Sequence, residues 1–308
     1  MTLASKTLAI TGGTGFVGGH LIDAALAEGH QVRALTRSVQ PERRGVDWVR
    51  GDLGDTPALA DLCTGADAVI HVAGVVNAKD EAGFRAGNIE GTRAMLDAAS
   101  SAGVGRFVQV SSLSAREPGL SVYGASKAKA DRLVVESALD WVIVRPPAVY
   151  GPGDREMLDL YRAAKKGWAA APGSGRFSLI YVTDLAAALL ALGTSDAGSG
   201  NIYEIEDGTG GLDHGAMAAL LGDAVGRKPR VIPLPGAALT VGAAFDTLRA
   251  RVSRRLPKLS FDRARYIAHP DWTADAGPLR ALGIWEPRVM PADGVRRTAD
   301  WYRAAGLL

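Results

Sequence analysis

The fold is decided by a stretch near the start of the chain, Thr7-Leu8-Ala9-Ile10-Thr11-Gly12-Gly13-Thr14-Gly15-Phe16-Val17-Gly18-Gly19-His20. An apolar, β-branched run leads directly into clustered glycines, and from Phe16 onward apolar residues recur with helical spacing. This order predicts a strand, a tight turn and a helix. Because a helix N-terminus presents unpaired backbone N–H groups and the positive end of its dipole, such a turn is suited to bind an anion.

The spacing of the glycines indicates which anion to expect. Gly13-x-Gly15-x-x-Gly18 satisfies the dinucleotide-binding pattern at the required junction of strand and helix. Gly12 is expected to permit the turn, Gly15 to let a pyrophosphate approach the backbone, and Gly18 to let the helix pack closely on the strand. An ordinary glycine-rich turn is the alternative interpretation.

Composition sets broad limits. With 308 residues, 47% hydrophobic and 22% charged, the chain is expected to form one large or two modest globular domains. A net charge of +2 gives no reason to expect nucleic acid as a partner. The single cysteine, Cys63, fits a reducing compartment, and no cleavable apolar segment precedes the first strand, so we expect a cytoplasmic protein. No run approaches the roughly 20 apolar residues of a membrane-spanning helix.

Further apolar runs predict parallel strands alternating with helices, at residues 31–36, 46–50, 68–73, 106–111, 141–145 and 201–206. After the second of the predicted strands, an acidic residue would bind the 2′-hydroxyl of an adenosine ribose. The sequence there is Ala34-Leu35-Thr36-Arg37-Ser38, without an acid. Arg37 is suited to pair with a 2′-phosphate, which favours NADP(H) over NAD(H). Arg43 and Arg44 are placed to assist, and a solvated loop role for Arg37 is the alternative.

A second group of polar residues follows the fifth predicted strand. Tyr123 and Lys127 are four residues apart, so on a helix they share one face. Ser112 lies eleven residues before Tyr123, at the carboxyl end of the strand, where α/β sheets bind their ligands. The Tyr-x-x-x-Lys spacing alone is weak evidence, and its position in the chain is what strengthens it.

Together these features resemble the extended branch of the short-chain dehydrogenase/reductase family. The resemblance rests on Thr11-Gly12-x-x-Gly15-x-x-Gly18, on Ser112, Tyr123 and Lys127, on Arg145-Pro146-Pro147-Ala148-Val149-Tyr150-Gly151-Pro152-Gly153, and on Phe177-Ser178-Leu179-Ile180-Tyr181-Val182-Thr183-Asp184. It covers about the first 205 residues. That branch includes epimerase/dehydratase-like enzymes as well as 3β-hydroxysteroid dehydrogenases, dihydroflavonol reductases and ceramide reductases.

The resemblance implies a fold and a division of the chain. The expected fold is α/β, a doubly wound parallel sheet (Rossmann) with a smaller, mostly helical C-terminal substrate lobe. Residues 1–145 would form the dinucleotide-binding core, completed by about 177–206, and residues 146–308 would form the substrate lobe and the C-terminal helices. Asp184 is expected to cap the helix that follows it.

The resemblance also implies roles for individual residues. Asp52 and Leu53 would contact the adenine ring, Ala73 and Gly74 would lie beneath the adenosine, and the loop from Pro146 to Val149 would pass the nicotinamide. Asn88 would position Lys127. The alternatives are a turn or helix cap for Asp52 and an exposed helical position for Asn88. The full set of expected cofactor-binding residues is Gly12, Thr14, Gly15, Phe16, Val17, Arg37, Asp52, Leu53, Ala73, Gly74, Tyr123, Lys127, Pro146 and Val149.

The implied chemistry is hydride transfer between a nicotinamide ring and a carbonyl carbon. Tyr123 would exchange the proton, and its pKa, ordinarily near 10, would be lowered by the Lys127 ammonium and by the oxidised nicotinamide. Ser112 would orient the substrate oxygen, with Ser111 and Ser114 as alternatives. No metal site is predicted, because the five histidines are scattered, and His71 is expected to be a core residue.

The substrate is inferred from a helix expected at residues 239–256. Leu248, Val252 and Leu256 repeat every four residues, while Arg251 and Arg255 mark another face; Arg249, Arg254 and Lys258 add charge. This pattern is compatible with an anionic membrane surface or with the mouth of an apolar substrate site, and equally with a helix packed on the core.

A preference for NADP(H) suggests net reduction, and the amphipathic pattern of residues 239–256 suggests a lipid-like substrate. Together they favour reduction of a ketone on a bulky, apolar molecule, such as a keto-ceramide or a steroid. A nucleotide-sugar epimerase or dehydratase is the first alternative, and a non-catalytic dinucleotide sensor or structural subunit is the second. Relatives often form homodimers through the helices that carry Asn88 and Tyr123, but the faces of these helices do not decide this here.

Overall fold

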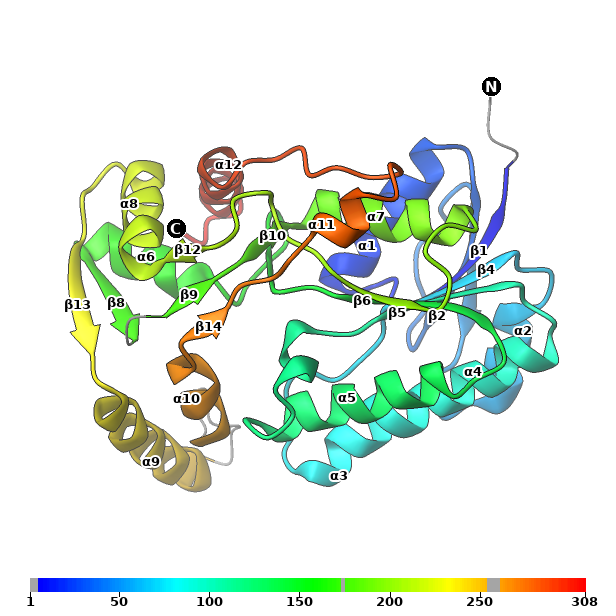
Figure 1. Ribbon diagram of the computed structural model, residues 1–308, viewed down its shortest axis with the longest axis horizontal. Coiled ribbons are helices and arrows are strands. Elements are labelled where there is room, and N and C mark those ends of the chain that lie inside the picture. Colours follow the sequence, from blue (N-terminus) through cyan, green and yellow to red (C-terminus); the bar gives the residue numbers. More distant parts are fainter. Residues whose placement is uncertain (1–4, 173–174, 254–260) are drawn as a thin grey trace.

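The computed structural model describes residues 5–172, 175–253 and 261–308. Its centre is a seven-stranded sheet in the order β11-β6-β5-β4-β1-β2-β3, in which all neighbouring strands are parallel (Figure 1). The strands are β1 (Thr7–Thr11), β2 (Gln31–Thr36), β3 (Val46–Arg50), β4 (Ala68–His71), β5 (Arg106–Val110), β6 (Asp140–Arg145) and β11 (Asn201–Glu204). The predicted Rossmann fold is thereby confirmed.

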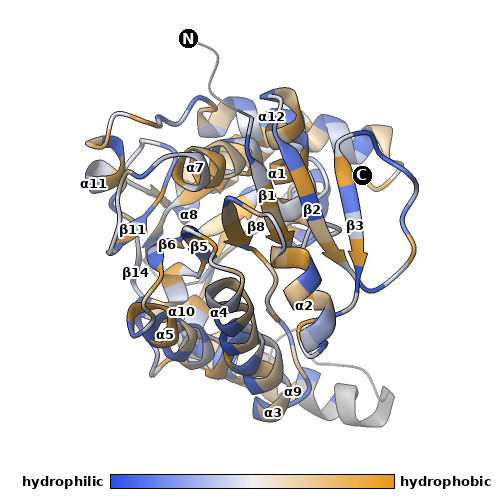
Figure 2. Cartoon of the chain, turned by 90° about the vertical axis from the view of Figure 1, so that its right-hand side faces the viewer, coloured by the Kyte–Doolittle hydropathy of each residue, from blue (hydrophilic) through white to orange (hydrophobic). Residues whose placement is uncertain are grey.

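Helices cover both faces of this sheet (Figure 2). One face carries α1 (Phe16–Ala27) and α7 (Val182–Thr194), and the other carries α2 (Thr56–Cys63), α4 (Gly91–Ser101) and α5 (Val122–Val135). Alternate residues of a strand point to opposite faces. In β1, Leu8 and Ile10 therefore belong to the core with Leu185 of α7, whereas Ala9 belongs to the core with Met95 of α4.

The helix expected between strands β4 and β5 is not uniform. It comprises α3 (Glu81–Phe84), a π-helical segment η1 (Arg85–Glu90) that contains Asn88, and α4. Two glycines permit close contacts: a Cβ atom at Gly87 would lie 2.2 Å from Val75 Cγ2, and one at Gly91 would lie 2.7 Å from Leu53 Cδ1. Extra residues inserted into a helix in this way occur often at functional sites.

Three strands end earlier than expected, at His71, Val110 and Glu204, instead of at residues 73, 111 and 206. Ser111 N still donates to Val144 O of β6 at 2.8 Å, although β5 ends at Val110. Beyond the end of β4, Ala73 N donates to the Thr11 side chain at 3.1 Å.

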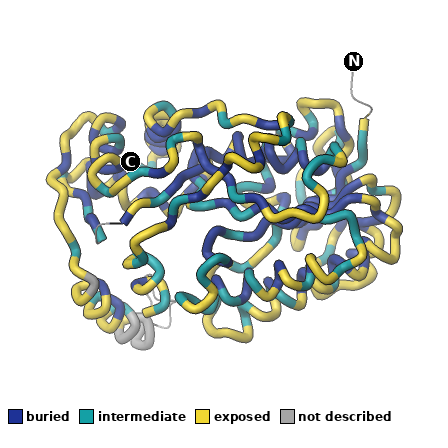
Figure 3. Tube along the Cα trace, in the orientation of Figure 1, coloured by how far each residue is buried: buried dark blue, intermediate teal, exposed yellow. Residues whose placement is uncertain are grey.

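The rest of the chain forms smaller sheets and helices beside the carboxyl edge of the large sheet (Figures 1 and 3). These elements are η2 (Leu113–Arg116), β7 (Ala148–Tyr150), α6 (Leu158–Lys166), β8 (Trp168–Pro172), β9 (Arg176–Phe177), β10 (Leu179–Tyr181), β12 (Leu212–Asp213), α8 (His214–Val225), β13 (Arg230–Leu234), α9 (Gly236–Ser253), α10 (Phe261–Ala268), β14 (Asp271–Trp272), α11 (Gly277–Arg280) and α12 (Pro291–Ala304). A separate hydrophobic core joins α6, α8 and α12 through Tyr161, Leu221 and Tyr302.

Asp184 does not cap α7 as expected, because Tyr181 is the N-cap residue and Asp184 lies in the first helical turn. Its buried carboxylate instead accepts hydrogen bonds from the backbone N–H groups of Arg288, at 2.9 Å, and Val289, at 2.8 Å. The Trp285 indole N–H donates to the Asp184 carbonyl at 2.9 Å. Asp184 therefore holds the segment before α12 against α7.

The expected basic helix coincides with α9. Arg254, Arg255, Leu256 and Lys258 lie outside the described residues, as do the side chains of Leu248, Arg251 and Val252. Contact with a membrane surface therefore stays a prediction. Within the described ranges, no helix is long and apolar enough to span a membrane.

Candidate active site

The glycine turn has the geometry of an anion cradle. Gly12 has φ +73°, and a Cβ atom there would lie 2.9 Å from Ala73 N. A Cβ at Gly18 would lie only 2.1 Å from Gly12 O, so the close packing of helix and turn requires glycine. Gly15 is the N-cap of α1 and provides no side-chain hydrogen bond, which leaves N–H groups of the first helical turn for a ligand. The turn thus fits a pyrophosphate.

A buried hydrogen-bond network supports this turn from below. The Thr11 hydroxyl lies 2.7 Å from His71 Nδ1, and Thr92 Oγ1 lies 3.4 Å from His71 Nε2. Because the Thr92 hydroxyl donates to Asn88 O at 2.7 Å, we assign the proton on the ring to Nε2. Burial, reinforced by the charge of Lys127, lowers the pKa of His71 to about 3, so the ring is neutral. His71 is a partnered core residue, as expected.

Asn88 is buried, so its alternative as an exposed helical residue is wrong. Its Oδ1 accepts from Val75 N at 2.6 Å, and its Nδ2 donates to Val75 O at 2.9 Å and to Ser126 Oγ at 2.8 Å. Ser126 in turn donates to Tyr123 O at 2.7 Å. Asn88 is therefore tied to the backbone of Tyr123, whereas the expected link from Asn88 to Lys127 is not among the hydrogen bonds seen in the described residues.

The predicted catalytic side chains converge on one cavity of about 240 Å³ at the carboxyl edge of the sheet. Its lining includes most of the residues predicted near the nicotinamide and the reacting groups. These residues are Val17, Gly74, Asn88, Ser112, Tyr123, Lys127, Pro146 and Val149, together with Val72, Val76, Val110, Ser111, Pro147 and Leu185. A lining that combines many apolar side chains with a few polar groups is typical of a small-molecule site.

Lys127 is buried, and its Nζ donates to Val110 O at 2.7 Å. Burial lowers the pKa of Lys127 to about 8, while the charge of Asp131 opposes this shift. The pKa of Tyr123 is raised, mainly by burial, although a hydrogen bond with Ser112 acts in the lowering direction. We expected Lys127 and an oxidised nicotinamide to lower the pKa of Tyr123. The protein without its cofactor does not lower it.

The three serines differ clearly in their surroundings. Ser112 is partly exposed to the cavity and accepts hydrogen bonds from Ser114 N at 3.3 Å and from Ser114 Oγ at 2.8 Å. Ser114 is buried and does not line the cavity. Ser111 lines it as well, and its hydroxyl has no partner among the described residues. The geometry favours Ser112, oriented by Ser114, and leaves Ser111 as an alternative.

At the adenosine end, Arg37 is exposed directly after β2. It takes part in none of the hydrogen bonds or ion pairs seen within the described ranges, whereas Arg43 is paired with Asp23. Asp52 Oδ1 accepts from Gly54 N at 2.8 Å, so Asp52 does act as a turn cap. Leu53 packs against Gly91, Thr14 is exposed on the turn, and Phe16 lies close to Gly153.

The sequence analysis missed an aromatic wall from the C-terminal elements. The rings of Tyr266 and Trp272 stack with centroids 4.4 Å apart. Asp262, also on α10, accepts a hydrogen bond from Val122 N at 3.1 Å, one residue before Tyr123. Burial and the proximity of Tyr123 raise the pKa of Tyr266 to about 12. No local motif marks these residues, because only the tertiary fold brings α10 to the start of α5, where Tyr123 lies.

A Rossmann sheet with a glycine turn, and a Tyr/Lys pair on one cavity, define a dinucleotide-dependent oxidoreductase of the short-chain dehydrogenase/reductase type. Residues 8–205 match the model of the NAD dependent epimerase/dehydratase family. The chain belongs to this family and is an NAD(P)-dependent oxidoreductase of the extended type.

Individual relatives agree with this assignment. The chain is 40% identical to a ceramide reductase of Caulobacter vibrioides, over 100% of this chain and 98% of that protein. It is 31% identical to a 2-alkyl-3-oxoalkanoate reductase of Stenotrophomonas maltophilia, over 94% of this chain and 97% of that protein. A solved structure of MoeE5 in complex with UDP-glucuronic acid and NAD has a TM-score of 0.75 and 21% identity, covering 98% of this chain and all of that one, and shows the shared fold.

Proposed function

We propose that this protein uses NADP(H) to reduce a ketone to an alcohol on a bulky, apolar molecule, such as a keto-ceramide or a steroid. The observation that carries the proposal is the convergence of Ser112, Tyr123 and Lys127 on one cavity beside Gly74 and the Pro146 loop. Two relatives match this chain over nearly their whole length. One is named a ceramide reductase and the other a 2-alkyl-3-oxoalkanoate reductase.

In the proposed reaction, the reduced nicotinamide supplies the hydride that the carbonyl carbon accepts. The Tyr123 hydroxyl donates its proton to the carbonyl oxygen, so the C=O π bond is replaced by one C–H and one O–H bond. The raised pKa of Tyr123 keeps the phenol protonated before this step. The Ser112 hydroxyl, which accepts hydrogen bonds from Ser114, donates its own proton toward the same oxygen and orients it.

Lys127 acts on Tyr123 through its charge. Both residues line the cavity from the same face of α5. A protonated Lys127 stabilises the phenolate that remains on Tyr123 after the proton has left. Lys127 and Asn88 lie beside Gly74, since a Cβ there would be 3.6 Å from Lys127 Nζ and 3.1 Å from Asn88 Oδ1. The same ammonium is therefore placed to bind the hydroxyls of the nicotinamide ribose.

The wall of Tyr266 and Trp272 supports an apolar substrate. Leu113 and Trp272 belong to one hydrophobic cluster, against which Leu120, Phe177 and Tyr266 pack. Tyr266 is half-buried and lies near Tyr123. Aromatic side chains there offer a large apolar contact area to a lipid-like molecule.

Nucleotide-sugar epimerisation is the second candidate, because the family that matches residues 8–205 is described by its epimerases and dehydratases. Such an enzyme would act on a sugar nucleotide without net consumption of cofactor. A non-catalytic dinucleotide-binding role is the third candidate, although Tyr123 and Lys127 are both present.

The test is reduction of keto-ceramide and 3-oxosteroid substrates with NADPH, followed by identification of the alcohol. We expect Tyr123→Phe to lower kcat by about 100-fold or more, because a general acid contributes at least that factor. NADPH affinity serves as the control and should be retained. Equal activity of Tyr123→Phe and wild type would refute the catalytic assignment, and epimerisation of a sugar nucleotide without added cofactor would favour the second candidate.

A further inference from the structure

A buried ion pair lies one helical turn beyond Lys127. Tyr123, Lys127 and Asp131 are spaced four residues apart on α5, and both Lys127 and Asp131 are buried. Residues at this spacing share one helix face. Asp131 Oδ2 accepts a hydrogen bond from Arg145 Nε at 3.0 Å and lies 2.9 Å from the second guanidinium nitrogen. Asp131 thus shares a face of α5 with Lys127 and is bonded to Arg145 at the end of β6.

Burial lowers the pKa of Lys127, because an ammonium without its water shell is unfavourable. The titratable groups that face this part of the core are His71 from β4, Tyr123 and Asp131 from α5, and Arg145 from β6. His71 is neutral, and Arg145 repels a second cation. Among these groups Asp131 is the one anion, and it acts to keep the pKa of Lys127 high.

The carboxylate is only partly used by Arg145. Both contacts with the guanidinium involve Oδ2, whereas Oδ1 accepts no hydrogen bond from the described residues. A buried carboxylate with one oxygen free of hydrogen bonds interacts strongly with a nearby cation, because little water screens its charge.

We propose that Asp131 is a positioning residue that holds Lys127 in its charged form beside Tyr123. This inference rests on the proposed function, in which the Lys127 ammonium stabilises the phenolate of Tyr123. Arg145 directly precedes Pro146, whose carbonyl accepts from Leu113 N at 2.8 Å. The ion pair therefore also joins α5 to the loop that lines the cavity.

The experiment measures the titration of Lys127 directly, in the full chain. Lysines carrying ¹³C at Cε are titrated by NMR, and the Lys127 signal is identified by its loss in Lys127→Arg. We expect Asp131→Asn to lower the Lys127 midpoint by about one pH unit or more, because an adjacent opposite charge shifts a pKa by that order. Lys127 is charged below its pKa, so the alkaline limb of kcat should move to lower pH by the same amount, while activity at lower pH is retained.

Asp140, at the opposite end of β6 from Arg145, provides a matched control. Asp140, at the start of β6, accepts two hydrogen bonds of 2.9 Å from the buried Arg106 of β5. Asp140→Asn removes a comparable ion pair and should leave the Lys127 midpoint unchanged. Asp131→Glu, which keeps the charge, should restore the wild-type pH profile.

A second variant tests the opposite sign. Arg145→Gln removes the competing cation and should raise the Lys127 midpoint, which keeps the proposal testable if Asp131→Asn does not fold. An unchanged midpoint in either variant overturns the proposal. A shifted midpoint in a protein that reduces no ketone would instead leave the role of Asp131 standing and refute the proposed function, because the NMR titration requires no substrate.

Discussion

Single residues at the cavity show how burial sets protonation. The same loss of hydration raises the pKa of Tyr123 and lowers that of Lys127 to about 8. A protonated phenol is the form that donates to a carbonyl, which is the form the proposed reduction requires of Tyr123. Asp131 works against the loss of the Lys127 charge. The outcome depends on which neighbour lies closest, which a sequence pattern does not state.

The proposed preference for NADP(H) depends on Arg37, which is exposed directly after β2. We expect Arg37→Ala to weaken NADPH binding by about 10- to 100-fold, because a charge-assisted contact to the 2′-phosphate is lost. NADH binding should change little. Fluorescence titration of both cofactors measures this difference.

The control for Arg37 is Arg93→Ala, which removes an exposed arginine on α4 whose partner is Glu90. It should alter neither affinity. If wild type binds NADH as well as NADPH, or if Arg37→Ala leaves NADPH binding intact, the assignment of NADP(H) is wrong and the search for a substrate turns to sugar nucleotides.

At the scale of elements, the junction of β1 and α1 is the most constrained part of the molecule. Gly12 turns the chain with positive φ, Gly18 touches the turn, and Thr11 joins the turn to His71 on β4. The π-helical segment η1 brings Asn88 to the same region from the neighbouring layer. The glycine turn is thus held by close backbone approach and by buried hydrogen bonds.

Adjacent glycines in α1 test this close approach. Gly18→Ala should lower the free energy of unfolding by about 2 to 3 kcal/mol, because its Cβ would overlap Gly12 O. Gly19→Ala should raise it by up to about 1 kcal/mol, because its nearest neighbour is 4.0 Å away and alanine favours helices. Urea unfolding separates the two, and equal effects of both substitutions would contradict the packing argument.

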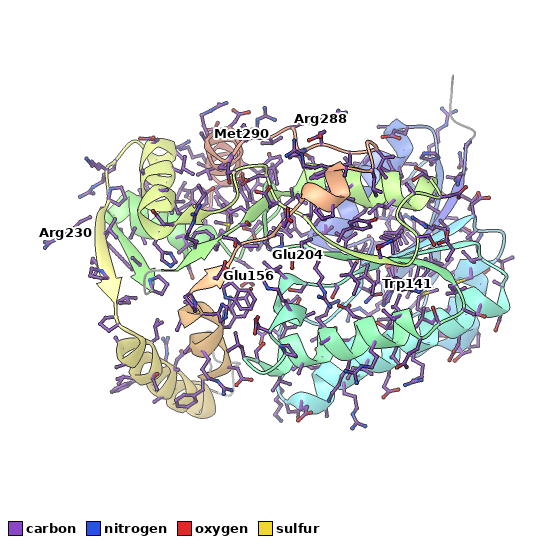
Figure 4. The ribbon with its side chains drawn as sticks, viewed as in Figure 1. Trp141, Glu156, Glu204, Arg230, Arg288 and Met290 are labelled. Atoms are coloured by element: carbon purple, nitrogen blue, oxygen red, sulfur yellow. The ribbon has the colours of Figure 1, made fainter. Side chains whose placement is uncertain are left out.

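At the scale of the whole molecule, the C-terminal elements are attached to the end of the sheet. Arg116, at the end of η2, donates to Thr273 O at 2.9 Å and Asp271 O at 3.0 Å. It also pairs with Glu204 at 3.4 Å, and Figure 4 places Glu204 where the sheet meets these elements. This attachment holds α10 and β14 beside the segment from Ser112 to Tyr123.

The proposed apolar substrate leads to a prediction for Tyr266. Tyr266→Ala should raise KM for a long-chain ketone by about 10-fold or more, because apolar contact area is lost, and should hardly change the kinetics of a small ketone. Tyr266→Phe should resemble wild type. Phe261→Ala, on the exposed side of the same helix, is the matched control. A uniform loss of activity toward both ketones would argue against a role in substrate size.

Local patterns in the sequence determined the Rossmann sheet, the glycine turn and the pairing of Tyr123 with Lys127. Backbone geometry and helical spacing are short-range properties, so residues 7–20 and 123–127 carry their own information. The extended family was recognisable for the same reason. Strand ends and the π-helical segment were not, because hydrogen bonds to distant residues decide where each element stops.

Only the tertiary structure decided which distant groups meet at the cavity. It placed Asp131 between Lys127 and Arg145, bound Asn88 to Val75 and Ser126 instead of to Lys127, and brought Tyr266 next to Tyr123. It also gave Asp184 a role other than capping. Such contacts join residues up to 143 positions apart, from 123 to 266, and depend on how whole layers pack. The spacing of Tyr123 and Lys127 was evident in the sequence, whereas the charged and aromatic groups around them are brought there only by the packing of distant segments.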